Sequence, residues 1–90
     1  MIFIYDQKKS EANFAKHGID FDQARMLWED DRSVVLVSPY TLEERHLVIG
    51  MIEGKYWVAV VTYRGEATRI ISVRRARKKE VDYYGQENQC

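Results

Sequence analysis

The feature that most constrains the fold is a series of four strand-like runs in the second half of the chain, joined by short loops. The runs are rich in β-branched and aromatic residues and cover residues 33–38, 45–52, 56–63 and 67–74. The last three runs are separated only by EGK at 53–55 and RGE at 64–66, and each loop contains a glycine. Loops this short can join only antiparallel neighbours. The sequence therefore predicts an antiparallel sheet.

Helices are expected on both sides of these runs. Asp6 is placed to cap a helix over residues 7–17, which Gly18 would end. Asp20 and Gln23 have the spacing of a capping box at the start of a second helix. The segment RARKKEVDYY predicts a final helix.

A short strand, IFIY, precedes all of these elements, so the expected order is β-α-α-β-β-β-β-α. This order predicts a small α+β domain, with N-terminal helices and a C-terminal helix packed on an antiparallel sheet. The central runs are apolar on both faces, so one face should meet helices and the other should be at least partly covered. We expect residues 1–84 to form one domain and residues 85–90 a flexible tail.

Length and composition place the chain among small globular proteins. It has 90 residues, of which 46% are hydrophobic. No apolar run approaches the roughly 18 residues of a membrane span, and the N-terminus lacks the charged leader of a secretory signal. The single cysteine, Cys90, cannot form an internal disulfide, so we expect an inert tail thiol and a cytoplasmic location.

The charge is distributed unevenly although the chain is neutral, with 14 basic and 14 acidic residues. Residues 69–80 carry six basic side chains and one acidic, a net charge of +5. Residues 20–53 carry eight acidic and three basic, a net charge of −5. A basic face of this kind favours contact with a polyanion.

Several classes of chemistry lack the residues that they need. The two histidines, His17 and His46, belong to no cluster with metal-ligand spacing, so no metal or other cofactor is expected. Cys90 lies in the expected tail, and the sequence contains no phosphate-binding loop and no serine nucleophile motif. The reactive side chains that remain are Arg, Lys, His, Tyr and Glu.

These side chains suit RNA cleavage, because the 2′-hydroxyl of RNA is a nucleophile that needs no metal. The protein must take a proton from this hydroxyl, stabilise the charge on the phosphorane and protonate the leaving oxygen. Arginine, whose planar fork matches two phosphate oxygens, can stabilise the charge.

Strand alternation creates a difficulty for a shared arginine site. Arg69 and Arg74 lie on opposite faces of a regular strand, and only a bulge near Ser72 or an early strand end would bring them together.

Purely structural roles, without any part in catalysis, also remain open for several of these residues. Arg69 would pair with a surface carboxylate, and His17 would satisfy the last carbonyls of its helix. Arg77, Lys78 and Lys79 would form a solvated helix face, and Tyr83 and Tyr84 would serve packing.

Three segments of the chain resemble the BrnT toxins of bacterial type II toxin–antitoxin systems. They are YDQKKSEANFAKHGIDFDQARMLWED, EERHLVIG and TRIISVRRARKKEVDYY, in that order, from about Tyr5 to Tyr84. The chain departs from the pattern at Tyr5, where the family often has Trp, and at Val73, where it often has Ala. The matching positions are Lys16, His17, Glu44, Arg45, Arg69, Ser72, Arg74, Ala76, Glu80 and Tyr84.

The resemblance implies a small cytoplasmic ribonuclease with a RelE/ParE-like fold that arrests translation by cutting RNA. It also implies a neutralising BrnA-like antitoxin, whose ribbon-helix-helix represses the shared promoter. The toxin and antitoxin would form a hetero-oligomer, so the toxin would meet DNA only through its partner, and no membrane would be involved.

The leading hypothesis is therefore a metal-independent endoribonuclease toxin. Arg69 and Arg74 would stabilise the phosphorane, with Arg45 as a third candidate. His17 and Glu44 are the candidates for proton transfer. The RNA backbone would be held by Lys16, Arg75, Arg77 and Lys78. The alternatives are a non-catalytic basic module that docks an acidic protein or a nucleic-acid backbone, and a fragment that needs a partner to complete its core.

Overall fold

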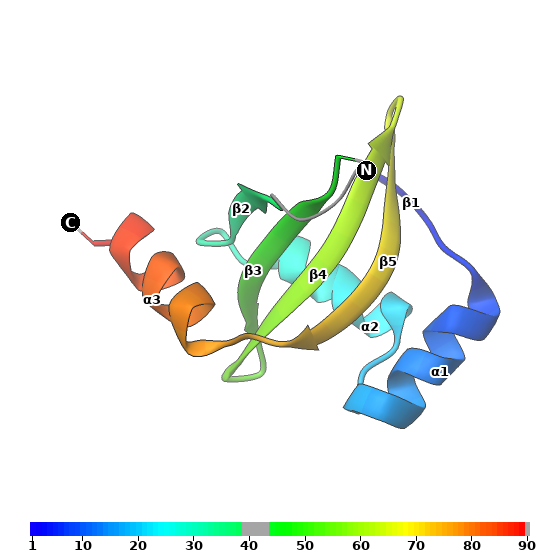
Figure 1. The fold of residues 1–90 in the computed structure, drawn as a ribbon, viewed down its shortest axis with the longest axis horizontal. Coiled ribbons are helices and arrows are strands. Elements are labelled where there is room, and N and C mark those ends of the chain that lie inside the picture. Colours follow the sequence, from blue (N-terminus) through cyan, green and yellow to red (C-terminus); the bar gives the residue numbers. More distant parts are fainter. Residues whose placement is uncertain (39–43, 90) are drawn as a thin grey trace.

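The predicted order of elements is found in the structure, a computed structural model that describes residues 1–38 and 44–89 (Figure 1). The elements are β1 (Ile2–Ile4), α1 (Gln7–His17), α2 (Phe21–Ala24), the 3-10 helix η1 (Arg25–Glu29), β2 (Val34–Val37), β3 (His46–Ile52), β4 (Lys55–Arg64), β5 (Ala67–Arg75) and α3 (Lys78–Glu87). The α+β class is confirmed. The helix α3 continues to Glu87, so it enters the segment expected as a tail, and Cys90 lies outside the described residues.

The sheet has the strand order β1-β5-β4-β3-β2. Strands β3, β4 and β5 are antiparallel, as their short loops predicted, and β2 also pairs with β3 in the antiparallel direction. The one difference is β1, which pairs with β5 in parallel and makes the sheet mixed. Two helices, and no hairpin loop, follow β1 in the chain, so no short connection sets its direction.

The hairpin between β3 and β4 turns through two residues with left-handed backbone, Glu53 at a φ of 50° and Gly54 at 80°. The next hairpin has Gly65 at a φ of 60°. Glycine adopts this conformation without a Cβ clash, which explains its place in both loops. These tight turns set the register of the three central strands.

The predicted helix caps are present. The carboxylate of Asp6 accepts hydrogen bonds from the backbone N–H groups of Lys8 and Lys9, and Gly18 ends α1 with a φ of 79°. Asp20 and Gln23 form the predicted capping box. The helix that follows changes to 3-10 geometry at Arg25.

A buried asparagine joins α1 to the sheet. The side chain of Asn13 donates to the carbonyl oxygens of Ile19 and Val73, at 2.8 and 2.9 Å, and accepts from the Val73 N–H at 3.1 Å. It therefore pairs with β5 in the manner of a neighbouring strand. This contact positions α1 beside β5, with the start of the helix near the first half of that strand.

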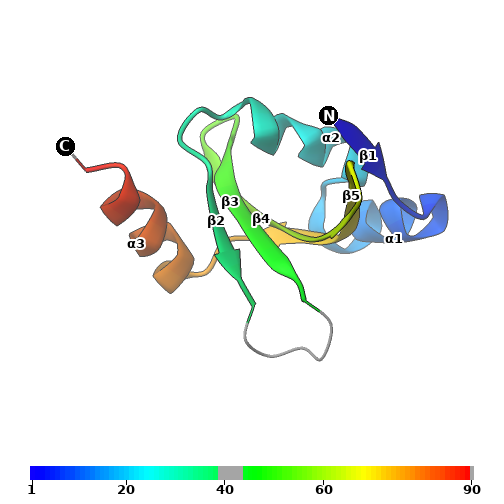
Figure 2. The same ribbon diagram turned by 90° about the horizontal axis from the view of Figure 1, so that it is seen from above.

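The sheet has two differently covered faces, as Figures 1 and 2 show. The α1–α2 face packs Val48, Ala59, Val61 and other apolar strand residues against Phe21, Ala24 and Leu27 of the helices. The α3 face packs a smaller cluster around Ile49, Val58 and Tyr84. The prediction that the second face is partly covered is confirmed, and its uncovered part holds the candidate site.

A bulge in β5 brings Arg69 and Arg74 to the same face. Val60 pairs with Ser72 but the next residue, Val61, pairs with Ile70, so Ile71 is an extra residue in β5. Arg69 is opposite Thr62 and Arg74 is opposite Val58, and these two β4 residues share a face because they are four positions apart. Of the two features that would allow a shared arginine face, the bulge is therefore present, and the early strand end is not, since β5 runs to Arg75.

Polar contacts from α3 hold it against its face of the sheet. The Tyr84 hydroxyl donates to the Asp30 carboxylate at 2.9 Å, and Arg74 forms a two-point ion pair with Glu80 at 2.8 and 2.7 Å. Burial, with the hydrogen bond and charge of Asp30, raises the pKa of Tyr84 to about 12, so this hydroxyl remains a donor.

Acid is expected to weaken this attachment. Burial opposes ionisation of Asp30 and Glu80. Hydrogen bonds outweigh it and hold both pKa values below their ordinary range: backbone N–H groups and Tyr84 donate to Asp30, and Arg74 and a backbone N–H donate to Glu80. A lowered carboxyl pKa stabilises the fold above the unfolded pKa of about 4, and this contribution is lost as the pH falls through the folded pKa.

In urea unfolding, the contribution of these two carboxylates to the free energy of unfolding should therefore stay constant between pH 7 and 5. It should fall below pH 4. A variant with Tyr84→Phe and Glu80→Gln should be less stable at pH 7 and should lose less on acidification. An equally steep acid dependence in this variant would show that other carboxylates control it.

Candidate functional site

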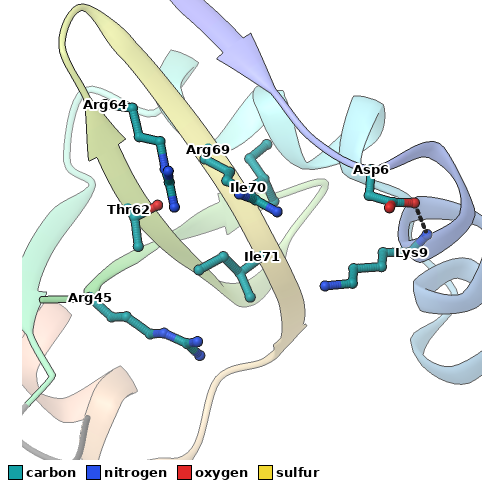
Figure 3. Close-up of a pocket in the computed structure, with 8 residues that line it drawn as sticks. All are labelled: Asp6, Lys9, Arg45, Thr62, Arg64, Arg69, Ile70 and Ile71. Atoms are coloured by element: carbon teal, nitrogen blue, oxygen red, sulfur yellow. Dashed lines mark hydrogen bonds between the residues drawn. The ribbon is translucent and has the colours of Figure 1, made fainter. Parts of the chain in front are cut away.

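A cavity of about 120 Å³ lies on the uncovered part of the α3 face, where the first turn of α1 faces β5 (Figure 3). It is lined by Asp6, Lys9, Arg45, Thr62, Arg64, Arg69, Ile70 and Ile71. We call it the arginine pocket. Four of these side chains are cationic and one is acidic, and they come from α1 and its cap, from the residue before β3, and from β4 and β5. The cavity has room for several water molecules, and thus for a phosphate group.

Two arginines stand on either side of a threonine in this pocket. Thr62 pairs with Arg69 across β4 and β5. On its other side, His46 pairs with Val61, so the preceding residue, Arg45, stands beside Thr62. Neighbouring strands lie about 4.8 Å apart, so the two arginine backbones are separated by roughly 10 Å with Thr62 between them. We call these three residues the Arg-Thr-Arg row.

Two buried polar atoms of this row have no hydrogen-bond partner among the described residues. Arg45 Nε and Thr62 Oγ1 are both buried and form no hydrogen bond with any described residue. Among the described residues, Lys9, Arg45 and Arg69 also form no ion pair. Because buried polar groups are nearly always paired in folded proteins, these atoms indicate a site for a ligand that accepts hydrogen bonds.

Asp6, the acidic residue among the described residues that line the pocket, already accepts hydrogen bonds. Asp6 Oδ1 accepts the backbone N–H groups of Lys8 and Lys9 at 2.8 and 3.2 Å, as the cap of α1. In Figure 3 the Lys9 side chain extends from the same turn toward β5. The pocket therefore presents an excess of positive charge, which favours an anion.

The predicted proton-transfer residues do not line the pocket. Lys16 and His17 are at the opposite end of α1 from Lys9, about 12 Å along the helix axis. Glu44 is next to Arg45 in the chain, and its side chain is 73% exposed, with Oε1 3.7 Å from His46 Nε2. His46 pairs with Val61 of the α1–α2 face, so the structure places the Glu44 carboxylate beside a residue of the opposite face, and neither Glu44 nor His17 lines the pocket.

The remaining predicted basic residues also lie outside the pocket. Arg74 is on the same face as Arg69, but both of its terminal nitrogens bind Glu80. Arg75 lies over the Trp57 ring, with 5.4 Å between its central carbon and the ring centroid. Arg77 is the N-cap of α3, and Lys78 forms an exposed ion pair with Asp82. Arg75 pairs with Trp57, a residue of the α1–α2 face, so it lies on the opposite face of the sheet from the pocket, whereas Arg77 and Lys78 lie at the start of α3.

Of the polar residues that line the pocket, Lys9, Thr62 and Arg64 were missed in the sequence, and Asp6 was predicted only as a helix cap. A signal for Thr62 was available, because the two hairpin loops set the register that places it between Arg45 and Arg69. No comparable signal exists for Lys9, whose position depends on how α1 packs on the sheet.

Two further searches cover only the part of the chain that the structure describes. In residues 1–38 and 44–89, no group of three or more His, Cys, Asp or Glu side chains is arranged to hold a metal ion. None of the described helices has the length and apolar composition of a membrane span.

Comparison with models of protein families gives a match over most of the chain. Residues 5–80 match the family described as "Ribonuclease toxin, BrnT, of type II toxin-antitoxin system". A search of curated proteins finds no significant match. The matched span contains every residue that lines the arginine pocket.

Proposed function

The chain belongs to the BrnT family of ribonuclease toxins of type II toxin–antitoxin systems, and from this premise we propose that it is a metal-independent endoribonuclease whose scissile phosphate binds in the arginine pocket. The observation that carries the proposal is the convergence of Arg45 and Arg69 on one cavity, without carboxylate partners among the described residues. The family supplies the general activity, and the pocket supplies the location.

The proposed reaction begins when the 2′-oxygen of a ribose attacks the neighbouring phosphorus. A P–O bond forms, the bond to the 5′-oxygen breaks, and the products are a cyclic phosphate and a 5′-hydroxyl. The phosphorane between these states carries more negative charge than the substrate does. Arg45 and Arg69 would approach it from either side, and such donors act by stabilising charge that develops in the transition state.

Proton transfer needs a base for the 2′-hydroxyl and an acid for the leaving 5′-oxygen. We assign the acid to Lys9, which lines the pocket, and the base to Glu44, which precedes Arg45 in the chain and whose exposed side chain would turn from His46 toward the pocket. His17 would not take part directly, since α1 holds it away from the pocket. Outside the pocket, Arg77 and Lys78 at the start of α3 would contact the RNA backbone, whereas Arg75 lies on the opposite face of β5 and would take no part in the same contact.

A type II system implies a protein antitoxin as the second partner. We propose a BrnA-like ribbon-helix-helix protein in a hetero-oligomer with this chain, in the cytoplasm. Contact with DNA would pass through that antitoxin. The toxin itself would contact RNA.

The test is cleavage of a labelled single-stranded RNA by the purified protein in excess EDTA. We expect undiminished cleavage, with cyclic phosphate ends, because the arginine side chains supply the positive charge that a metal would otherwise provide. Duplex DNA of the same sequence should stay intact, because it lacks the 2′-hydroxyl. Cleavage that requires a divalent ion would contradict the mechanism, and RNA retention without fragments would favour a non-catalytic binding module.

A further inference from the structure

We infer that the Thr62 hydroxyl is a phosphate ligand: it donates a hydrogen bond to a non-bridging oxygen of a phosphodiester held between Arg45 and Arg69. This inference rests on the proposed function for the identity of the substrate. It adds a neutral contact that neither the charge pattern nor the family description assigns.

The first argument is the burial of this hydroxyl without a partner. Thr62 is only 4% exposed, yet Oγ1 forms no hydrogen bond with any described residue. A buried hydroxyl without a partner destabilises a fold, so its presence calls for an explanation. Figure 3 shows the oxygen on the side of Thr62 that faces Arg64 and Arg69.

The second argument is that a neighbouring residue of the pocket also has a buried polar atom without a hydrogen-bond partner among the described residues. Arg45 Nε also lines the pocket region and is also buried without a hydrogen-bond partner among the described residues. A guanidinium nitrogen can only donate, and a hydroxyl can donate as well. One ligand with several acceptor oxygens would satisfy both, and a phosphate is such a ligand.

The third argument is the geometry of the row. Cross-strand partners on one face stand side by side, so Thr62 is held in the middle of the Arg-Thr-Arg row, with an arginine on each side. Arginine side chains are long and mobile, whereas the side chain of a β-branched residue in a strand is restricted. Thr62 would therefore position the phosphate relative to the two guanidinium groups.

The experiment replaces the hydroxyl by a methyl group of similar shape, with Thr62→Val. Because an unpaired buried hydroxyl is removed, the melting temperature of the free protein should rise, by about 4 °C. Inorganic phosphate should bind about tenfold more weakly, measured as the thermal shift over a concentration series. RNA cleavage should fall about tenfold or more. Thr62→Ser, which keeps the hydroxyl, should stay close to the natural protein in binding and cleavage.

The control is Thr68→Val, which alters another buried threonine of the sheet, on the opposite face of β5 and outside the pocket. It should leave phosphate binding unchanged. A lower melting temperature for Thr62→Val, or an unchanged phosphate shift, would overturn the inference even if Arg69 variants were inactive. If the natural protein binds phosphate through Thr62 but cuts no RNA, the inference stands and the proposed nuclease activity fails.

Discussion

Arg69→Ala is expected to lower the rate of RNA cleavage by about 100- to 1000-fold, the usual loss when one preorganised donor to a developing oxyanion is removed. Arg69 lines the arginine pocket and has no ion-pair partner among the described residues, so its charge is available to a phosphate. For the same reason its removal breaks no ion pair, and the melting temperature should change little. Single-turnover cleavage of a labelled RNA measures the effect.

Two matched variants separate this effect from a general loss of charge. Arg25→Ala removes an exposed arginine that contacts Phe3 and Asp22, outside the pocket, and should keep cleavage within about twofold. His17→Gln alters the far end of α1 and should do the same. Arg69→Lys should recover only part of the rate, because lysine keeps the charge and loses the planar fork. Full cleavage by Arg69→Ala would show that the arginine pocket takes no part in the reaction.

The elements that could be predicted from the sequence are those set by local contacts. Asp6 and Asp20 cap helices through bonds to residues two or three positions away, and the glycines of the hairpin loops occupy turns that need a left-handed backbone. Short loops also determine which strands are neighbours. The antiparallel part of the sheet and the order of elements follow from these local rules.

The features that could not be predicted depend on contacts between distant segments. The parallel pairing of β1 with β5 joins residues about 65 positions apart. A bulge near Ser72 is one of the two features that the sequence offers for a shared arginine face, and its presence, at Ile71, depends on packing: Ile70 and Val73 are both buried on the α1–α2 face, although they are three residues apart. A regular strand would place them on opposite faces.

The candidate site was predicted in part for the same reason. Arg45 and Arg69 were named from residue type and resemblance, and the structure brings them together. His17 was grouped with them because a lysine and a glycine flank it in the sequence, but those neighbours do not indicate which end of α1 faces the sheet. Here Asn13 sets the position of the helix, and the Lys9 end lines the pocket.

Arg74, a predicted site residue, is held in an ion pair that suggests a structural role. Its two terminal nitrogens bind the two carboxylate oxygens of Glu80, and the side chains are only 22% and 11% exposed. Glu80 also accepts the backbone N–H of Arg77 at the start of α3. We therefore expect Arg74 to hold α3 on the sheet, and to affect RNA cleavage only through the position of that helix.

The expected result is that Arg74→Ala and Glu80→Ala each reduce the free energy of unfolding by about 3 kcal/mol, because each leaves a largely buried charge without its partner. In the double variant, the free energy of unfolding should fall by less than the sum of the two single reductions, since no charge is left unpaired. Urea unfolding at pH 7 measures all three. An additive double variant would contradict the coupling between the two side chains.

Cleavage by the same variants distinguishes positioning from direct contact with RNA. If Arg74 acts through α3, both single variants should reduce cleavage to a similar extent, well short of the loss expected for Arg69→Ala, and the double variant should be no worse. If Arg74 instead binds the phosphorane, Arg74→Ala should abolish cleavage. Glu80→Ala, which releases the guanidinium group, should then preserve or increase it. Opposite effects of the two single variants on cleavage would therefore show that Arg74 belongs to the catalytic site. Similar effects would show that Arg45 and Arg69 stabilise the charge without Arg74.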